Sequence, residues 1–432
     1  MRYIQCEGSL KRRLDNLAHE GIKPELFNAM QEGGIEAIKE FFSIPYDTYS
    51  SRRYYIRNIT FIAAMHNQFE LVNYLITTYK GQIDPSLFHL AMRFGAVDVV
   101  NSLILQGADI NQRDPRHNDE MAIITAIKAG QLATVSLLIE KGLDLKELEK
   151  RADCLPWYEL YSESPLHAAA QQGHGIIVEY LVQQGMDISV NENSSTKTTL
   201  LHAVAKPVCR ETKDSIELVK RKIQLIKYLV QQGVNVHAED THGETVLHLA
   251  AKYRQFELLK FLLNNTNSEI NHPCERGTVL HLALLNSPED SNQILQFFIN
   301  KSIDINAVDK YGNTALHQVL DKFFFGYFIS SSDTIKRLLL AGANPTIKNH
   351  SGVSAYDVFM EKYTKYQKHV AKNPLKNEFM REFQILNVFF SDYSNKSLPK
   401  TKKEWKSAFF NVITSSEQKN QLVSFEGSKL SN

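Results

Sequence analysis

The stretch SPLHAAAQQGHGIIVEYLVQQGMDI, residues 164–188, combines two short apolar segments with glycines that follow them. Leu166 and the alanines after it give the first segment a small-residue face, and the apolar residues of 177–182 recur at helical spacing. Gly173 separates the segments, and Gly185 follows the second, where a left-handed residue ends a helix. The stretch predicts two short helices, neither of which can bury its apolar face alone.

Similar stretches recur along the chain. They begin at Ser86, Met121, Ser164, Thr199, Thr245, Thr278 and Thr314, with separations of 35, 43, 35, 46, 33 and 36 residues. Several open on T-x-L-H and several close on a phrase such as GADI at 107–110 or GANP at 342–345. Degenerate copies occupy residues 24–42 and 58–76, and a partial copy after Gly352 has Asp357 in place of the histidine. The chain is therefore predicted to be a repeat protein.

The period and the signature resemble the ankyrin-repeat family. The resemblance implies an all-α solenoid of helix–turn–helix units with finger loops, with about nine units over residues 24–360 that diverge at both ends. Stacked units would share one continuous core. We expect an N-terminal helical cap over residues 1–23 and a helical C-terminal extension with a flexible polar tail over residues 361–432.

The signature histidine is a structural residue in ankyrin proteins, where it ties the first helix to loop backbone by hydrogen bonds. The resemblance assigns this role to His89, His167, His202, His248, His281 and His317. The alternative is a metal ligand or a general base. The structural role is favoured because the residue recurs at the repeat period without a carboxylate or cysteine at ligand spacing.

Catalytic signatures are missing from the sequence. It contains no G-x-x-x-x-G-K-[ST], G-x-G-x-x-G, G-x-S-x-G or H-E-x-x-H. Cys154 with His167, or Cys209 with His202, could pair a thiol nucleophile with a base. We expect no enzyme activity, metal or cofactor, and keep as the alternative a cysteine-dependent enzyme in the divergent terminal regions.

Composition sets limits on partners and location. Lys and Arg total 49 against 48 Asp and Glu, so net charge gives no general attraction to nucleic acid. Cys6, Cys154, Cys209 and Cys274 are far apart, which suits reduced thiols. The sequence shows neither a signal peptide nor an apolar membrane span. We expect a monomer that is cytoplasmic, or that enters a host-cell cytosol without a cleavable signal.

An insertion interrupts the array before Ser164. The distance from the closing glycine to the next repeat is 12 to 14 residues in most units, but it is 22 from Gly142 to Ser164. The extra sequence includes Trp157, Tyr158 and Tyr161, and aromatic residues of these types dominate binding hot spots. The insertion is either a partner-binding loop or a segment that folds back onto the array.

Two further insertions fall between the helices of a unit. Residues 206–222 are either a solvated helix extension or a basic patch for an acidic partner or lipid headgroup, with Lys220, Arg221 and Lys222 at its core. Residues 321–333 contain five aromatic residues. These are either an exposed anchor or, as we favour, part of a cap formed with C-terminal aromatics.

The resemblance also predicts a concave binding face formed by the finger loops and the first helices. The finger residues that would contact a partner are Arg113, Asp114, Arg116, His117, Asp240, His242, Glu275, Arg276, Asp309, Lys310, Tyr311, Asn349 and His350. Their mixed charges favour a polar protein partner over nucleic acid.

The C-terminal tail allows further interpretations. Residues 396–413 form a basic amphipathic piece that would suit a membrane-surface adaptor, although we expect no membrane contact. The polar end, TSSEQKNQLVSFEGSKLSN, resembles translocation signals of bacterial effectors, and SLPK is similar to part of the F-box-like tails of viral ankyrin proteins. We expect a non-enzymatic scaffold that captures one partner protein on its concave face, as an effector or adaptor in a host cytosol.

Overall fold

The computed structural model describes most of the repeat region and little of either end of the chain. The described residues are 34–43, 49–79, 85–114, 120–148, 164–189, 197–208, 215–266, 268–285, 291–322 and 328–372, with positions 28, 32, 386, 387 and 390. Two compact units divide the chain, Met1–Asn235 (unit 1) and Val236–Asn432 (unit 2). Each unit is described by itself, and a continuous core along the whole array stays a prediction.

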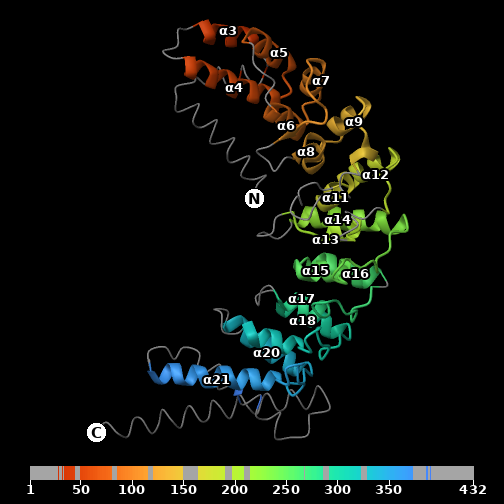
Figure 1. The fold of residues 1–432 in the computed structure, drawn as a ribbon, viewed down its shortest axis with the longest axis vertical. Coiled ribbons are helices and arrows are strands. Elements are labelled where there is room, and N and C mark those ends of the chain that lie inside the picture. Colours follow the sequence, from red (N-terminus) through yellow and green to blue (C-terminus); the bar gives the residue numbers. More distant parts are fainter. Residues whose placement is uncertain are drawn as a thin grey trace. The chain divides into compact units, whose positions relative to one another are not determined.

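The described part of unit 1 is a succession of helices (Figure 1) with one β-hairpin, whose two strands have two residues each. Its elements are α3 (Ile35–Ser43), α4 (Tyr49–Met65), α5 (Phe69–Thr78), α6 (Pro85–Phe94), α7 (Val97–Leu105), β1 (Arg113–Asp114), β2 (Glu120–Met121), α8 (Ala122–Ala129), α9 (Leu132–Glu140), α11 (Pro165–Gln171), α12 (Gly175–Gln183), α13 (Leu200–Ala205) and α14 (Ile216–Gln231).

The helices of unit 1 form two layers. The first helices of successive repeats pack on one another in the order α4, α6, α8, α11 and α13. Among the second helices, α5 packs on α7, α7 on α9, and α12 on α14. Each repeat thus buries its apolar residues against its neighbours, as the sequence pattern predicts.

The repeat at residues 164–188 shows how its sequence produces this packing. Three alanines, Ala168 to Ala170, are completely buried in α11 and let neighbouring first helices approach closely. Val178 and Leu181 of α12 are also fully buried. Each such apolar side chain contributes roughly 1.5–3 kcal/mol relative to exposure. Gly173 turns the chain between the two helices with a φ of 67°.

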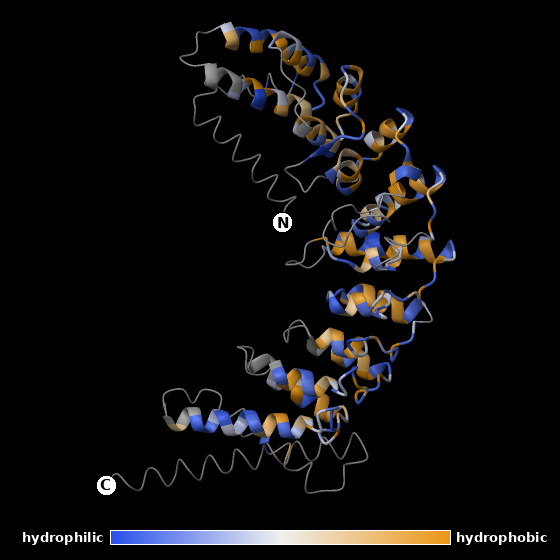
Figure 2. Cartoon of the chain, in the orientation of Figure 1, coloured by the Kyte–Doolittle hydropathy of each residue, from blue (hydrophilic) through white to orange (hydrophobic). Residues whose placement is uncertain are grey.

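Unit 2 repeats the same design with α15 (Val246–Lys252), α16 (Phe256–Asn265), α17 (Val279–Leu285), α18 (Ser291–Asn300), α19 (Ala315–Lys322), α20 (Phe328–Leu340) and α21 (Ala355–Lys372). Its first helices α15, α17, α19 and α21 pack in that order, and α18 packs on α20. In Figure 2, α21 is largely hydrophilic along its length, which suits a helix at the end of an array.

At the C-terminal end, α21 runs without a break from Ala355 to Lys372, across the array boundary predicted at residue 360, which stays a prediction. Phe359 of this helix is fully buried and stacks on Phe390 at a centroid distance of 4.5 Å. Phe390 therefore packs against the last repeat. The predicted N-terminal cap over residues 1–23 and the polar tail lie outside the described residues.

The fold is an all-α ankyrin-type solenoid, as predicted. In the described residues, the extended backbone consists of the β1–β2 hairpin and three isolated bridges, Cys274–Gly277, Val308–Thr314 and Lys348–Ser354. No helix in this part of the chain has the length and apolar character needed to cross a bilayer.

Candidate protein-interaction surface

The signature histidines of unit 2 each join two neighbouring repeats. The His248 ring accepts a hydrogen bond at Nδ1 from the Thr245 backbone N–H at 3.2 Å, and its Nε2 lies 3.0 Å from the carbonyl oxygen of His272 in the next repeat. This pattern places the ring proton on Nε2. His281 bonds in the same way to Thr278 and, at 3.1 Å, to the Asn313 carbonyl oxygen. His317 reaches the Val353 carbonyl oxygen at 3.2 Å.

Burial keeps these rings neutral near pH 7. His248 and His281 are fully buried. Desolvation lowers the pKa of His248 to about 4 and also lowers the pKa of His281 and of His317. A neutral ring can accept at one nitrogen and donate at the other, as these bonds require. The rings are therefore fixed structural links and are poorly suited to act as general bases.

The histidines of unit 1 vary the same arrangement. His167 Nε2 lies 3.1 Å from the Thr198 carbonyl oxygen, and His202 Nδ1 accepts from the Thr199 backbone N–H at 3.1 Å. His89 instead meets the Thr125 hydroxyl at 2.9 Å. Since Thr125 belongs to α8 of the following repeat, this bond also links neighbours.

The finger loops of unit 2 are fixed by side chains that bond to backbone. Asp240 Oδ1 accepts hydrogen bonds from the N–H groups of residues 242 and 244, at 2.8 and 2.9 Å. Asp309 and Asn349 accept bonds from the residues two and four positions further on in the same way. These side chains thus shape the turns.

The finger at 274–277 is one residue shorter than the fingers that begin at Asp240, Asp309 and Asn349. Cys274 occupies the position of these residues. Its Sγ donates to the Gly277 carbonyl oxygen at 2.9 Å. Burial raises the pKa of the Cys274 thiol to about 11, so the thiol stays protonated at neutral pH. Cys274 is therefore structural, whereas Cys154 and Cys209, the proposed nucleophiles, lie outside the described residues.

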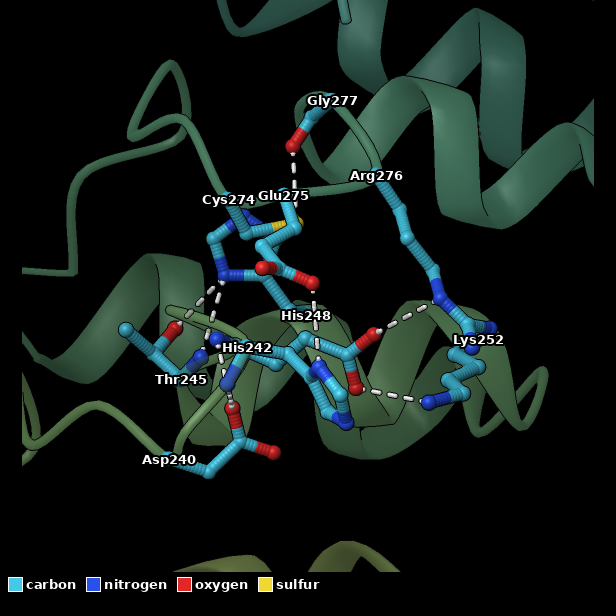
Figure 3. A network of polar contacts seen from close by, with 10 residues as sticks. Asp240, His242, Thr245, His248, Lys252, Cys274, Glu275, Arg276 and Gly277 are labelled. Carbon is cyan, nitrogen blue, oxygen red and sulfur yellow. Dashed lines mark hydrogen bonds and ion pairs between the residues drawn. The ribbon is translucent and has the colours of Figure 1, made fainter. Parts of the chain in front are cut away.

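Adjacent finger tips are bonded to each other. The Glu275 N–H donates to the His242 carbonyl oxygen at 3.0 Å, and Glu275 Oε2 lies 3.0 Å from His242 Nδ1 (Figure 3). Lys310 Nζ is 3.8 Å from the same carboxylate oxygen. Further along, the His350 N–H donates to the Tyr311 carbonyl oxygen at 2.9 Å. The tips thus form an ordered row.

We call the exposed side chains of these tips the finger row, which consists of His242, Glu275, Arg276, Lys310, Tyr311 and His350. Tyr311 is 61% exposed, and Lys310 Nζ lies 5.4 Å from the centre of its ring. The hydrogen bond with His242, followed by the charge of Lys310, holds the pKa of Glu275 below its usual range. The row therefore presents one exposed aromatic side chain among ionic groups.

An ion pair beneath the row was missed in the sequence. The Glu244 side chain is 1% exposed and lies 2.6 Å from Lys252 Nζ and 3.9 Å from Arg276 Nε (Figure 3). A buried carboxylate needs such partners, because its desolvation is costly. Nothing in the local sequence distinguishes Glu244 from an exposed finger residue.

Two residues predicted to contact a partner, Asp114 and Asp309, are instead buried. Asp114 is 1% exposed because it lies in β1, paired with Glu120 in the register of the hairpin. Asp309 is 9% exposed because its carboxylate bonds to its own turn. Asp240 and Asn349 also shape turns, and Arg113 pairs with Met121. Five other predicted contacts lie outside the described residues: Arg116, His117, Trp157, Tyr158 and Tyr161.

The core predicted for the basic insertion is also corrected. Lys222 is completely buried, and its Nζ donates to the Lys206 carbonyl oxygen at 2.8 Å. Lys220 and Arg221 are exposed. Lys222 therefore anchors α14 within the fold and adds nothing to the surface.

No group of three or more metal-ligating side chains comes together in the part of the chain that the structure describes.

A family model described as ankyrin repeats in three copies matches residues 87–192, 189–274 and 216–309. These matches together span just over half of the sequence. The chain belongs to the ankyrin-repeat family, which is typically non-enzymatic and serves as a scaffold for protein–protein interaction.

Similarity to individual proteins is lower. The chain is 26% identical over 298 residues to alpha-latrotoxin-Lg1a of Latrodectus geometricus, covering 60% of this chain and 20% of the toxin. It is 20% identical over 331 residues to the phosphocholine transferase AnkX of Legionella pneumophila, covering 73% of this chain and 32% of the transferase. This chain thus spans a fifth to a third of the length of these relatives.

Among solved structures, the ankyrin repeat domain of Bcl-3, a member of the IkappaB protein family, matches with a TM-score of 0.38 and 19% identity. The match covers 55% of this chain and 93% of the Bcl-3 domain.

Proposed function

We propose that the chain is a non-enzymatic scaffold that captures a partner protein through the finger row of unit 2. The order of this row carries the proposal, because two backbone hydrogen bonds and the Lys310–Glu275 ion pair join neighbouring tips while their side chains remain exposed. A surface that is ordered before binding loses little conformational entropy when a partner docks. Membership of the ankyrin-repeat family supports the same function.

Tyr311 is the proposed anchor of this interaction. It is the most exposed aromatic side chain described in unit 2, at 61% exposure, and tyrosine is common at binding hot spots. The charged and polar members of the finger row would surround it as a rim that selects the partner. Trp157, Tyr158 and Tyr161 of the insertion stay predicted as additional contacts.

The test compares partner binding by the full chain with binding by Tyr311→Ala. Cross-linking with the wild-type chain would identify the partner, whose affinity is then measured for each variant. We expect Tyr311→Ala to weaken binding by about tenfold or more, as for a hot-spot residue. Leu105→Ala is the matched control, since Leu105 is 75% exposed in unit 1. Equal affinity for wild type and Tyr311→Ala would reject the proposed anchor.

We further propose that the chain acts as an effector or adaptor in a host-cell cytosol. The polar C-terminal sequence and the similarity to a Legionella protein over 73% of this chain support this location. The test fuses the chain to a reporter enzyme that is active only in a eukaryotic cytosol. Delivery should be lost when residues 414–432 are deleted, and unchanged delivery would count against the signal.

A further inference from the structure

Charged residues are distributed unequally between the two helix layers of unit 1. The second helices α5, α7, α9 and α12, with the turns that follow them, are mainly acidic among the described residues, where Lys141 and Lys146 are basic. Their acidic residues are Glu70, Asp98, Asp109, Glu140, Asp144, Glu147, Glu179 and Asp187. The first-helix layer instead carries cations at the carboxyl ends of its helices.

These cations occupy one repeated position. Arg93, Lys128, Gln171 and Lys206 each lie four residues after the signature position of their repeat. Their first helices α6, α8, α11 and α13 pack in that order. Three cations and one amide therefore follow one another along the stack, and all four residues are half-buried.

Hydrogen bonds from side chains fix the backbone at three of these positions, those of the cations. Gln131 Nε2 donates to the Arg93 carbonyl oxygen at 3.2 Å, and His174 Nε2 lies 3.4 Å from the Lys128 carbonyl oxygen. Lys222 Nζ donates to the Lys206 carbonyl oxygen at 2.8 Å. The carboxyl ends of α6, α8 and α13 are thus held by side chains of later residues, which orders the backbone that carries the three cations.

The amino-terminal half of α14 extends the line of cations. The Arg221 guanidinium lies 3.4 Å from His174 Nδ1, and the neighbouring Lys220 is exposed. Burial lowers the pKa of His174, so its ring is neutral at pH 7 and the charge here comes from Lys and Arg. We define the basic strip as Arg93, Lys128, Lys206, Lys220 and Arg221.

We propose that the basic strip binds an extended acidic segment of a partner protein. Packed helices are about 8–10 Å apart, and an extended chain advances about 3.3 Å per residue. Three residues of such a segment would therefore span one repeat. Carboxylates at every third position would meet Arg93, Lys128 and Lys206 in turn, with an intervening position opposite the Gln171 amide.

The spacing favours an acidic protein segment over nucleic acid. Duplex DNA carries one charge per about 1.7 Å of its axis. A strip with roughly one cation per repeat would neutralise few of those charges. The three cations of the first-helix layer are also recessed, since all are half-buried and the Lys128 side chain is 19% exposed. A planar membrane surface would reach these three less readily than a single extended chain.

Glu120 reduces the charge of the basic strip at one point. Its Oε1 lies 3.2 Å from Lys128 Nζ, and its side chain is 15% exposed. Lys128 is therefore left unchanged in the test, and Arg93, Lys206 and Arg221 are the residues to substitute.

The test measures fluorescence anisotropy of a labelled peptide of about 15 residues with glutamate at every third position. The full chain would be titrated at about 50 and 300 mM salt. The triple variant Arg93→Gln, Lys206→Gln, Arg221→Gln should bind about tenfold more weakly, since several partly exposed charge pairs are lost. The control Lys141→Gln, Lys146→Gln, Lys227→Gln removes equal charge and should change affinity less than about twofold.

Several results would overturn the proposal. One is failure of the wild-type chain to bind the peptide at the lower salt concentration, and another is equal weakening of binding by both triple variants. A third such result is equal affinity for a peptide of the same composition with its glutamates in one block. Tighter binding of single-stranded DNA, or of phosphatidylserine vesicles, that is lost in the strip variant would reassign the surface. Circular dichroism would check folding, with the Arg93→Gln, Lys206→Gln pair as the milder variant. Tyr311→Ala should leave peptide binding unchanged, so this test is independent of the finger row.

Discussion

Histidine has two roles in unit 2, and burial separates them. His248 and His281 have no exposed surface and bond through both ring nitrogens. The side chain of His242 is 52% exposed and meets the carboxylate of Glu275. Histidines that look alike in the sequence are therefore structural in one position and available for recognition in another.

Replacing a buried histidine should destabilise the chain. We expect His281→Ala to lower the free energy of unfolding by about 2–3 kcal/mol, because the Thr278 N–H and the Asn313 carbonyl oxygen both lose their partner. His242→Ala, the exposed control, should change it by less than about 0.5 kcal/mol. Urea denaturation of the full chain measures both, and equal effects would contradict the assigned roles.

The buried histidines also predict acid sensitivity. The pKa of His248 is about 4 in the folded chain and about 6.5 when unfolded, so the unfolded chain takes up a proton first as pH falls. The stability contribution is full above about pH 6.5 and is lost progressively toward pH 4, by up to about 3 kcal/mol. His281 and His317 act in the same direction.

His248→Gln isolates this effect, because glutamine can donate and accept hydrogen bonds but does not titrate. Urea midpoints measured between pH 7.5 and pH 4 should fall less steeply in the variant than in the wild-type chain. An unchanged slope would show that other groups cause the acid sensitivity.

At the scale of the element, the short finger depends on Gly277. Its φ is 101°, and a Cβ atom there would lie 2.5 Å from Cγ of His281. We expect Gly277→Ala to destabilise unit 2 by about 2–4 kcal/mol through backbone strain and displacement of the histidine ring. Gly175→Ala is the control, since nothing lies within 4 Å of the added atom and α12 favours alanine. Comparable urea midpoints for the two variants would argue against the strain.

The helices could be predicted from the sequence because their apolar residues repeat with a helical period, as in Ile177, Val178 and Leu181. The surface could be predicted less well. Lys222 is charged, yet a carbonyl acceptor permits its burial, and Asp114 lies in a finger, yet hairpin pairing buries it. These outcomes depend on particular pairings with the backbone within one repeat, which a repeat period does not specify.

At the scale of the whole molecule, the division into two units predicts local responses to mutation. In repeat proteins, stability is approximately a sum of terms for each repeat and its neighbours. Hydrogen exchange in His281→Ala should therefore rise in residues 268–322 and remain unchanged in residues 85–148. A uniform increase along the chain would show that the units unfold together.

Four of the signature histidines share a direction, because each ring reaches from its own repeat to a backbone carbonyl oxygen nearer the C-terminus: His167 to Thr198, His248 to His272, His281 to Asn313, and His317 to Val353. Asp357 replaces the histidine in the last repeat and bonds only within its own turn, to Ser354. Deleting a repeat from the C-terminal side would thus leave the buried Nε2–H of a histidine without its acceptor on the repeat that remains. Deletion from the N-terminal side would leave no such donor. Trimming the array should be tolerated unequally from its two ends.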